Sequence, residues 1–213
     1  EIGMPYPVRP RGPEMALEIQ HHGPAQLTIA FYKDFPQGAA HLQRLAALPF
    51  SVGSASPRND VLTLFTQQQP HLVYFYCHGI DRDHVPFLRV GTEHDDDYIS
   101  TSNILNYDVD WSQTRPLVFI NGCQTAALAP DRALQFVRAF VEDALAAGVI
   151  GTEITVFEPL AQRFAETFLG QFVAGVPLGR AVRIARLALL AEQNPLGLVY
   201  IPHAYAGLRM VAT

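Results

Sequence analysis

Cysteine is scarce in this sequence. Only Cys77 and Cys123 occur among its 213 residues. Secreted domains that depend on disulfides carry several cysteine pairs, so two cysteines in a chain of this size do not form a disulfide framework. We therefore expect a reducing compartment, the cytoplasm.

Long apolar runs and clusters of positive charge are also missing. The longest apolar stretches, residues 72–76 and 117–120, are far shorter than the ~20 residues that span a bilayer. The net charge is -5, and no group of Lys and Arg resembles the patches that neutralise phosphates. We expect neither a membrane nor a nucleic acid as the main partner. The N-terminus has no hydrophobic signal core, and it begins with Glu1 and not methionine, which suggests a piece of a longer protein.

The composition is that of a folded chain. Hydrophobic residues make up 49% and charged residues 16% of the sequence, which favours a sizeable core over disorder. Its length suits one domain. Residues 1–24 are rich in proline and have no sustained periodicity, so we interpret them as an extended lead-in or linker. The expected domain then covers residues 25–213.

Strand and helix patterns alternate from residue 27 onward. Several strand candidates are nearly continuous in apolar residues, which is typical of parallel strands buried on both faces. The acid-rich stretch between residues 80 and 111 predicts a small hairpin and a loop. The pattern indicates an α/β fold with a mostly parallel sheet, helices on both faces and a hairpin insertion. Strands are expected at 27–32, 50–55, 71–77, 117–120, 149–152 and 198–201, and helices at 38–48, 56–69, 131–147, 160–173 and 178–190.

Two of the buried strands are each followed by, or end in, a reactive side chain. His78 follows the strand at 71–77, and Cys123 lies just beyond the strand at 117–120. Ligands of open parallel sheets bind beyond the carboxyl ends of the strands, so both residues are expected at the active edge. A thiolate can attack a carbonyl while an imidazole handles the proton. The backbone N–H groups of Gly79 and Cys123 are the candidates for holding the oxyanion.

These motifs resemble those of CHAT domains, which are caspase-related modules often attached to tetratricopeptide repeats. In caspases the catalytic histidine also precedes the cysteine, by about 50 residues. The resemblance covers roughly residues 27–210. It is carried by Val73-Tyr74-Phe75-Tyr76-Cys77-His78-Gly79, by Pro116-Leu117-Val118-Phe119-Ile120-Asn121-Gly122-Cys123-Gln124-Thr125, and by the tail from Ala165 through Gly179-Arg180-Ala181 and Arg186-Leu187-Ala188-Leu189-Leu190.

The resemblance implies a caspase-like three-layer sandwich and a cysteine endopeptidase with a His78–Cys123 dyad. It implies that no metal or organic cofactor is needed. The substrate would be another protein, and a sensor domain, a repeat domain or a partner protein would regulate the activity. A bacterial antiviral defence or cell-death pathway is the expected setting.

The sequence around the cysteine departs from that of caspases. Caspases have Gln-Ala-Cys-x-Gly there, whereas this chain has Asn-Gly-Cys-Gln-Thr at 121–125, so the caspase preference for aspartate is not carried over. By resemblance, the pocket for the residue before the scissile bond would draw on Asp34, Asn121 and Glu153. These positions include two carboxylates, Asp34 and Glu153, and one lysine, Lys33. A substrate with a basic side chain at the cleavage point is therefore one option.

Other readings of these residues are weaker. A cysteine phosphatase needs an arginine six places after Cys123, where Ala129 stands. A nucleotide-binding domain needs a glycine-rich loop after its first strand, where residues 33–36 read Lys-Asp-Phe-Pro. The acidic run at 93–97 is interpreted as a solvated loop in preference to a calcium site.

A zinc site formed by Cys77, His78, His84 and Cys123 lacks the paired spacing of such sites, and Cys77 is expected to pack inside its strand. The main alternative function is a caspase-fold interaction module in which the His78–Cys123 pair is idle.

Overall fold

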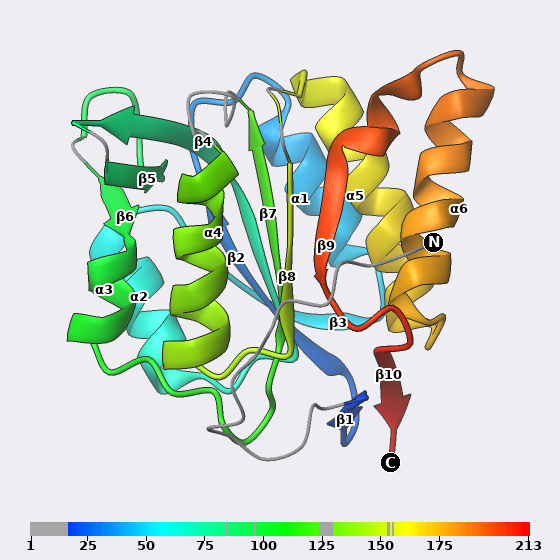
Figure 1. Cartoon of the computed structure of the whole chain (residues 1–213), viewed down its shortest axis with the longest axis horizontal. Coiled ribbons are helices and arrows are strands. Elements are labelled where there is room, and N and C mark those ends of the chain that lie inside the picture. Colours follow the sequence, from blue (N-terminus) through cyan, green and yellow to red (C-terminus); the bar gives the residue numbers. More distant parts are fainter. Residues whose placement is uncertain (1–16, 84, 96, 124–129, 153, 155) are drawn as a thin grey trace.

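A twisted, mostly parallel sheet forms the centre of the molecule (Figure 1). The computed structural model describes residues 17–83, 85–95, 97–123, 130–152, 154 and 156–213. Within them the main strands lie in the order β3-β2-β4-β7-β8-β9, and only the β8–β9 pair is antiparallel. The predicted mostly parallel sheet is confirmed. These strands are β2 (Ala25–Phe31), β3 (Phe50–Ala55), β4 (Leu72–Arg82), β7 (Leu117–Cys123), β8 (Gly148–Thr152) and β9 (Tyr200–Ala204).

Helices cover both faces of this sheet, as the alternating pattern predicted (Figure 1). Successive side chains of a strand face opposite sides, and β4 shows which helices lie on which side. Tyr74 faces α1, where its ring is 5.8 Å from that of His41, and Phe75 faces α2, where its ring is 5.6 Å from that of Phe65. The helices are α1 (Gly38–Ala46), α2 (Arg58–Gln67), α3 (Thr101–Asn106), α4 (Pro130–Arg138), α5 (Glu158–Val173) and α6 (Leu178–Ala191), with the π-helix η2 (Ala139–Asp143) continuing α4.

The core consists of apolar side chains from both faces of the central strands. Residues 72–77 of β4 are all buried, which explains their continuous apolar run. On one side α5 contributes a stripe of rings, in which Phe168 lies 5.5 Å from Phe119 of β7. No helix among the described residues combines the length and the apolar character needed to span a bilayer.

The hairpin insertion begins inside β4 and not after it. The strand was predicted to stop at His78-Gly79, but it continues to Arg82 because it pairs there with β5 (Val85–Arg89). A third short strand, β6 (Tyr98–Ser100), pairs with β5 and leads into α3. The backbone of residues 78–82 thus finds its hydrogen-bond partners on β5, and the sequence of β4 alone does not reveal this.

Both ends of the chain form a small second sheet. Strand β1 (Glu18–His21) pairs in parallel with β10 (Arg209–Ala212), and their central residues Ile19 and Met210 are buried. Residues 18–21, which were predicted to belong to an extended lead-in, form a strand of this sheet. The strand predicted at 198–201 begins at Tyr200, after the 3-10 helix η3 (Pro195–Val199). Each strand of the small sheet has four residues, too few for a periodic pattern, and its partner lies at the other end of the chain.

Close packing between β8 and β9 makes Gly148 sensitive to any side chain. A Cβ atom at residue 148 would lie 2.9 Å from the Cα of Ala204 and 3.0 Å from the carbonyl oxygen of His203. We expect Gly148→Ala to lower the free energy of unfolding by about 1–3 kcal/mol in urea denaturation, because the strands must move apart. Gly151→Ala in the same strand is the control: its Cβ meets nothing within 4 Å. Equal losses in both variants would contradict this packing.

Candidate functional site

The two predicted catalytic residues are paired across neighbouring strands. In the parallel β4–β7 ladder, His78 is the register partner of Cys123, and this is the last pair of the ladder. Adjacent strands lie about 4.8 Å apart, so the two backbones are brought together as the sequence predicted. His78 is thus located where parallel pairing ends and the hairpin with β5 begins.

Gly79 lies one position further along β4. It is buried and is the register partner of Leu88 on β5. The oxyanion role of the Gly79 and Cys123 N–H groups stays a prediction. Cys77 is fully buried, as expected of a packing residue.

A cavity of about 550 Å³ opens beside His78. Its walls come from the end of β2, the loop before α1, the β4–β5 hairpin and the segment that leads into α5. A cavity of this size accommodates a side chain of a peptide ligand. The lining residues are Tyr32, Asp34, Phe35, Pro36, His78, Ile80, Arg89, Glu93, Val156, Phe157 and Glu158.

Aromatic rings hold the imidazole of His78 at the cavity wall. The His78 ring lies 4.7 Å from the ring of Tyr32 and 4.6 Å from that of Phe35, measured between centroids. Phe35 also contacts the ring of Tyr76, at 4.5 Å. Edge contacts of this kind restrict the rotation of the imidazole.

Acidic side chains dominate the charge of the cavity. Asp34, a predicted substrate-binding residue, lines the cavity, and its Oδ2 accepts a hydrogen bond of 2.5 Å from the backbone N–H of Glu93. Among the described lining residues the one Lys or Arg is Arg89, the cross-strand partner of His78, and its guanidinium donates to the carbonyl oxygen of Glu93 at 2.6 Å. The described lining thus contains three acidic residues, Asp34, Glu93 and Glu158, and one arginine.

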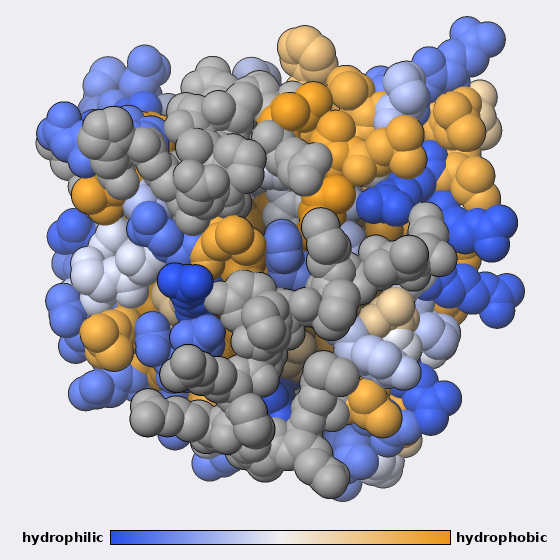
Figure 2. Space-filling model, in the orientation of Figure 1, coloured by the Kyte–Doolittle hydropathy of each residue, from blue (hydrophilic) through white to orange (hydrophobic). Residues whose placement is uncertain are grey.

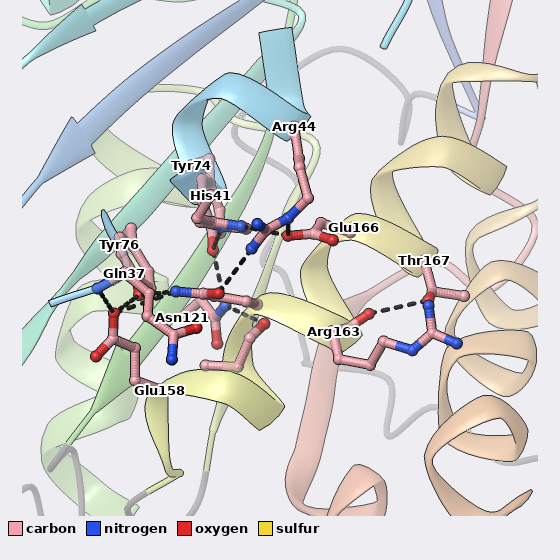
Figure 3. A network of polar contacts seen from close by, with 12 residues as sticks. Gln37, His41, Arg44, Tyr74, Tyr76, Asn121, Glu158, Arg163, Glu166 and Thr167 are labelled. Atoms are coloured by element: carbon pink, nitrogen blue, oxygen red, sulfur yellow. Dashed lines mark hydrogen bonds and ion pairs between the residues drawn. The ribbon is translucent and has the colours of Figure 1, made fainter. Parts of the chain in front are cut away.

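The sequence analysis missed Glu158. It occupies the first turn of α5, where the partial positive charge of the helix N-terminus favours a carboxylate. Its Oε1 accepts hydrogen bonds from the backbone N–H of Gln37 (2.9 Å), the hydroxyl of Tyr76 (2.9 Å) and Nε2 of Gln162 (3.1 Å) (Figure 3). The sequence did contain one signal. Glu158 is the acidic first residue of the helix that comes after the strand following Cys123.

Asn121 does not lie where the prediction placed it. It was expected to bind substrate, but its side chain is fully buried and is not part of the cavity lining. Its Nδ2 donates to the hydroxyl of Tyr74 and to the carbonyl oxygen of Ala161, both at 2.8 Å, and its Oδ1 accepts from the hydroxyl of Tyr200 at 2.9 Å. The side chain is engaged inside the protein. The third predicted pocket residue, Glu153, lies outside the described residues.

Asn121 and Glu158 belong to one polar network between the sheet, α1 and α5 (Figure 3). His41 of α1 is its buried centre, with Nε2 2.9 Å from the hydroxyl of Tyr74 and Nδ1 2.8 Å from Oε1 of Glu166. Arg44 donates to the same oxygen of Glu166 at 2.6 Å and to Oε1 of Gln162 at 2.8 Å. The network thus links the cavity wall to the strand that carries Cys123.

No group of three or more His, Cys, Asp or Glu side chains that could hold a metal ion occurs among the described residues. His84 of the zinc alternative lies outside them.

The stability of the fold should depend on the protonation of His41. Burial lowers the pKa of His41 below its ordinary value, and the hydrogen bond and charge of Glu166 offset this only in part. The unfolded chain protonates this histidine at a pKa of about 6.5, so its contribution to stability is present above that pH and is lost as the pH falls toward the lower folded-state pKa. Burial shifts His71 in the same direction.

We expect the free energy of unfolding, measured by urea denaturation, to fall as the pH is lowered below about 6.5. His41→Gln should show a shallower dependence in this range, although it is less stable at neutral pH. A slope equal to that of the parent protein would contradict the assignment of His41.

Comparison with known proteins agrees with this architecture. A solved separase–securin complex of Saccharomyces cerevisiae shares the fold with a TM-score of 0.58 at 11% identity, covering 93% of this chain and 13% of that chain. The Arg-specific cysteine proteinase gingipain R has a TM-score of 0.58 at 10% identity, over 92% and 48% of the two chains. The Drosophila initiator caspase Dronc has a TM-score of 0.53 at 13% identity, over 98% and 97%.

A sequence relative and a family model identify the family. A probable protease from Vitiosangium sp. (strain GDMCC 1.1324) is 48% identical over an alignment of 187 residues, and the match covers 83% of this chain and 24% of that protein. The chain thus spans about a quarter of the length of this relative. The family model described as the CHAT domain matches residues 13–207. With its caspase-like fold, the chain therefore belongs to the CHAT domain family.

Proposed function

We propose that this protein is a cysteine endopeptidase in which Cys123 is the nucleophile and His78 is the acid–base catalyst. The observation that supports it best is the pairing of His78 with Cys123 at the end of the β4–β7 ladder, beside a cavity that His78 lines. The family and the relative described as a probable protease support a peptidase.

The chemistry follows from these two side chains. The thiolate of Cys123 attacks the carbonyl carbon of a peptide bond, and the backbone N–H groups of Gly79 and Cys123 stabilise the oxyanion. The C–N bond then breaks, and the imidazolium of His78 gives its proton to the leaving amine. A water molecule, losing a proton to His78, attacks the resulting thioester and releases the acid product and the thiol.

A basic side chain is the residue that this cavity suits. Asp34 and Glu158 both line it, and Glu158 is held at Oε1 by three donors, an arrangement that fixes its carboxylate in place. The donors leave Oε2 of Glu158 for a cation. In this proposal Asp34 and Glu158 form the specificity pocket. Glu158 takes the place of Asn121 among the predicted substrate-binding residues, and Glu153 remains a candidate from the sequence.

The natural substrate is proposed to be another protein, in a cytoplasmic, regulated pathway of defence or cell death. We propose that a sensor domain, a repeat domain or a partner protein regulates the activity. The relative described as a probable protease is long enough to contain such a domain, because the match covers only 24% of it.

Figure 2 shows hydrophobic residues gathered over the upper part of one face, where Figure 1 places α5 and β9. The most exposed large hydrophobic residues described are Phe157, at the cavity, and Leu198, at 73% and 65%. Such a surface suits a partner protein.

The first test is the reactivity of the thiol. Iodoacetamide at neutral pH should alkylate Cys123 and spare buried Cys77, as measured by mass spectrometry of the peptides. In His78→Ala the rate at Cys123 should fall at least about tenfold, because its thiol returns toward an ordinary pKa of about 8.5. His71→Ala, just before the start of the same strand, is the control and should react like the parent. Equal rates in the parent and His78→Ala would favour the idle interaction module.

The second test addresses the specificity pocket. On a library of peptides, we expect cleavage after Arg or Lys, and Glu158→Gln should lower kcat/KM for those substrates by about 10–100-fold. This corresponds to about 1.5–3 kcal/mol for a hydrogen bond to a charged group. The amide keeps an acceptor for Gln37 and Tyr76, so the local fold is retained. Glu142→Gln, at an exposed position of η2, is the charge-matched control. Unchanged preference in Glu158→Gln would exclude this pocket.

A further inference from the structure

The end of β7 that carries Cys123 lies beside β4. Its pairing with β4 continues to Cys123, and the β7–β8 ladder joins Leu117–Phe119 to Gly148–Ile150. Asn121, two positions before Cys123, is fully buried in this last part of the strand. The hydrogen bonds of a buried amide help to fix the backbone that carries it.

The side chain of Asn121 anchors this segment of β7. It bonds to Tyr74 of β4, to the backbone of Ala161 in α5 and to Tyr200 at the start of β9. Tyr200 is the register partner of Thr152 of β8, so this bond reaches Asn121 from the β8–β9 side of the sheet. One side chain thus ties the strand end to three other elements.

The donors and acceptors around Asn121 fix its orientation. The carbonyl oxygen of Ala161 can only accept a hydrogen bond, so the group that faces it must be the NH2 of Asn121. The second hydrogen of that NH2 goes to the hydroxyl of Tyr74, whose own hydrogen then goes to Nε2 of His41. Nδ1–H of His41 in turn donates to Glu166. In this orientation both polar atoms of the amide are hydrogen-bonded.

This arrangement determines the position of the strand two residues before Cys123. By the alternation of a strand, positions 121 and 123 belong to the same face, as do their register partners Tyr76 and His78. Catalysis in an active site is sensitive to displacements of about 1 Å, which cost on the order of 100-fold in rate. A residue that fixes the strand end next to the nucleophile therefore affects its reactivity without touching substrate.

We propose that Asn121 is a positioning residue, which through Tyr74, Tyr200 and Ala161 holds Cys123 in register with His78. The inference rests on the proposed function, because it concerns the alignment of that catalytic pair. It replaces the expectation of a substrate contact with an internal role: Asn121 sets the geometry of the nucleophile, and Asp34 and Glu158 face the substrate.

The test removes hydrogen bonds of this network while the shape of the core is kept. Tyr200→Phe deletes the donor to Oδ1 of Asn121, and Tyr74→Phe deletes the acceptor of Nδ2 together with the bond to His41. Asn121→Asp keeps the shape but sets a carboxylate oxygen against the carbonyl oxygen of Ala161 and removes the hydrogen donated to Tyr74. Val182→Ala, a buried change on α6, is the control for a general loss of stability. The rate of Cys123 alkylation by iodoacetamide is measured against pH for each variant, together with its Tm.

We expect the pH profile of Cys123 in the three network variants to move toward that of an ordinary thiol, with a rate at pH 7 at least about tenfold lower. Val182→Ala should keep the parent profile at a comparable loss of Tm. With a cleavable peptide, the network variants should lower kcat and leave KM unchanged, whereas a substrate contact would raise KM.

Two other results are distinguishable. If the parent profile depends on His78 but all folded network variants retain it, Asn121 is merely structural and the inference is overturned. If the parent itself shows an ordinary thiol that His78→Ala does not change, the proposed function fails, and the inference with it. Should Asn121→Asp not fold, the two Tyr→Phe variants decide the matter.

Discussion

The parallel ladder between β4 and β7 is the constraint on which the rest of the structure depends. It runs without interruption from the Leu72–Leu117 pair to the His78–Cys123 pair. A slip of one residue would exchange the two faces of a strand, so Phe119 of β7 would lose its ring contact with Phe168 of α5. The burial of the core therefore also sets the alignment of the two reactive residues.

A polar network inside an apolar core refines that alignment. Apolar packing is tolerant of small displacements, whereas a buried amide must keep its donors and acceptors paired or lose about 1–3 kcal/mol for each unsatisfied group. Asn121 and His41 are both fully buried and both hydrogen-bonded on each polar atom. Packing thus chooses the register, and the network restricts the remaining freedom near the cavity.

The sequence predicted those features that depend on local patterns. The buried apolar runs revealed β4 and β7, the carboxyl ends of which placed His78 and Cys123 together, and the loop after the first strand contained Asp34 of the cavity. Features that depend on distant partners were missed or misread. The bonds of Asn121 come from residues 74, 161 and 200, so its two-residue distance from Cys123 suggested a substrate contact when the side chain in fact faces the core.

The cavity separates the residues proposed for catalysis from those proposed for specificity. His78 and its cross-strand partner Arg89 belong to the central sheet, whereas Asp34 and Glu158 come from the loop before α1 and the first turn of α5. Loops and helix ends tolerate substitution better than a ladder buried on both faces. The same fold, present in chains that are only 10–13% identical, can therefore keep the paired strands while the charge of the opposite wall changes. In this chain that wall is acidic, and three donors of the protein hold its carboxylate at residue 158.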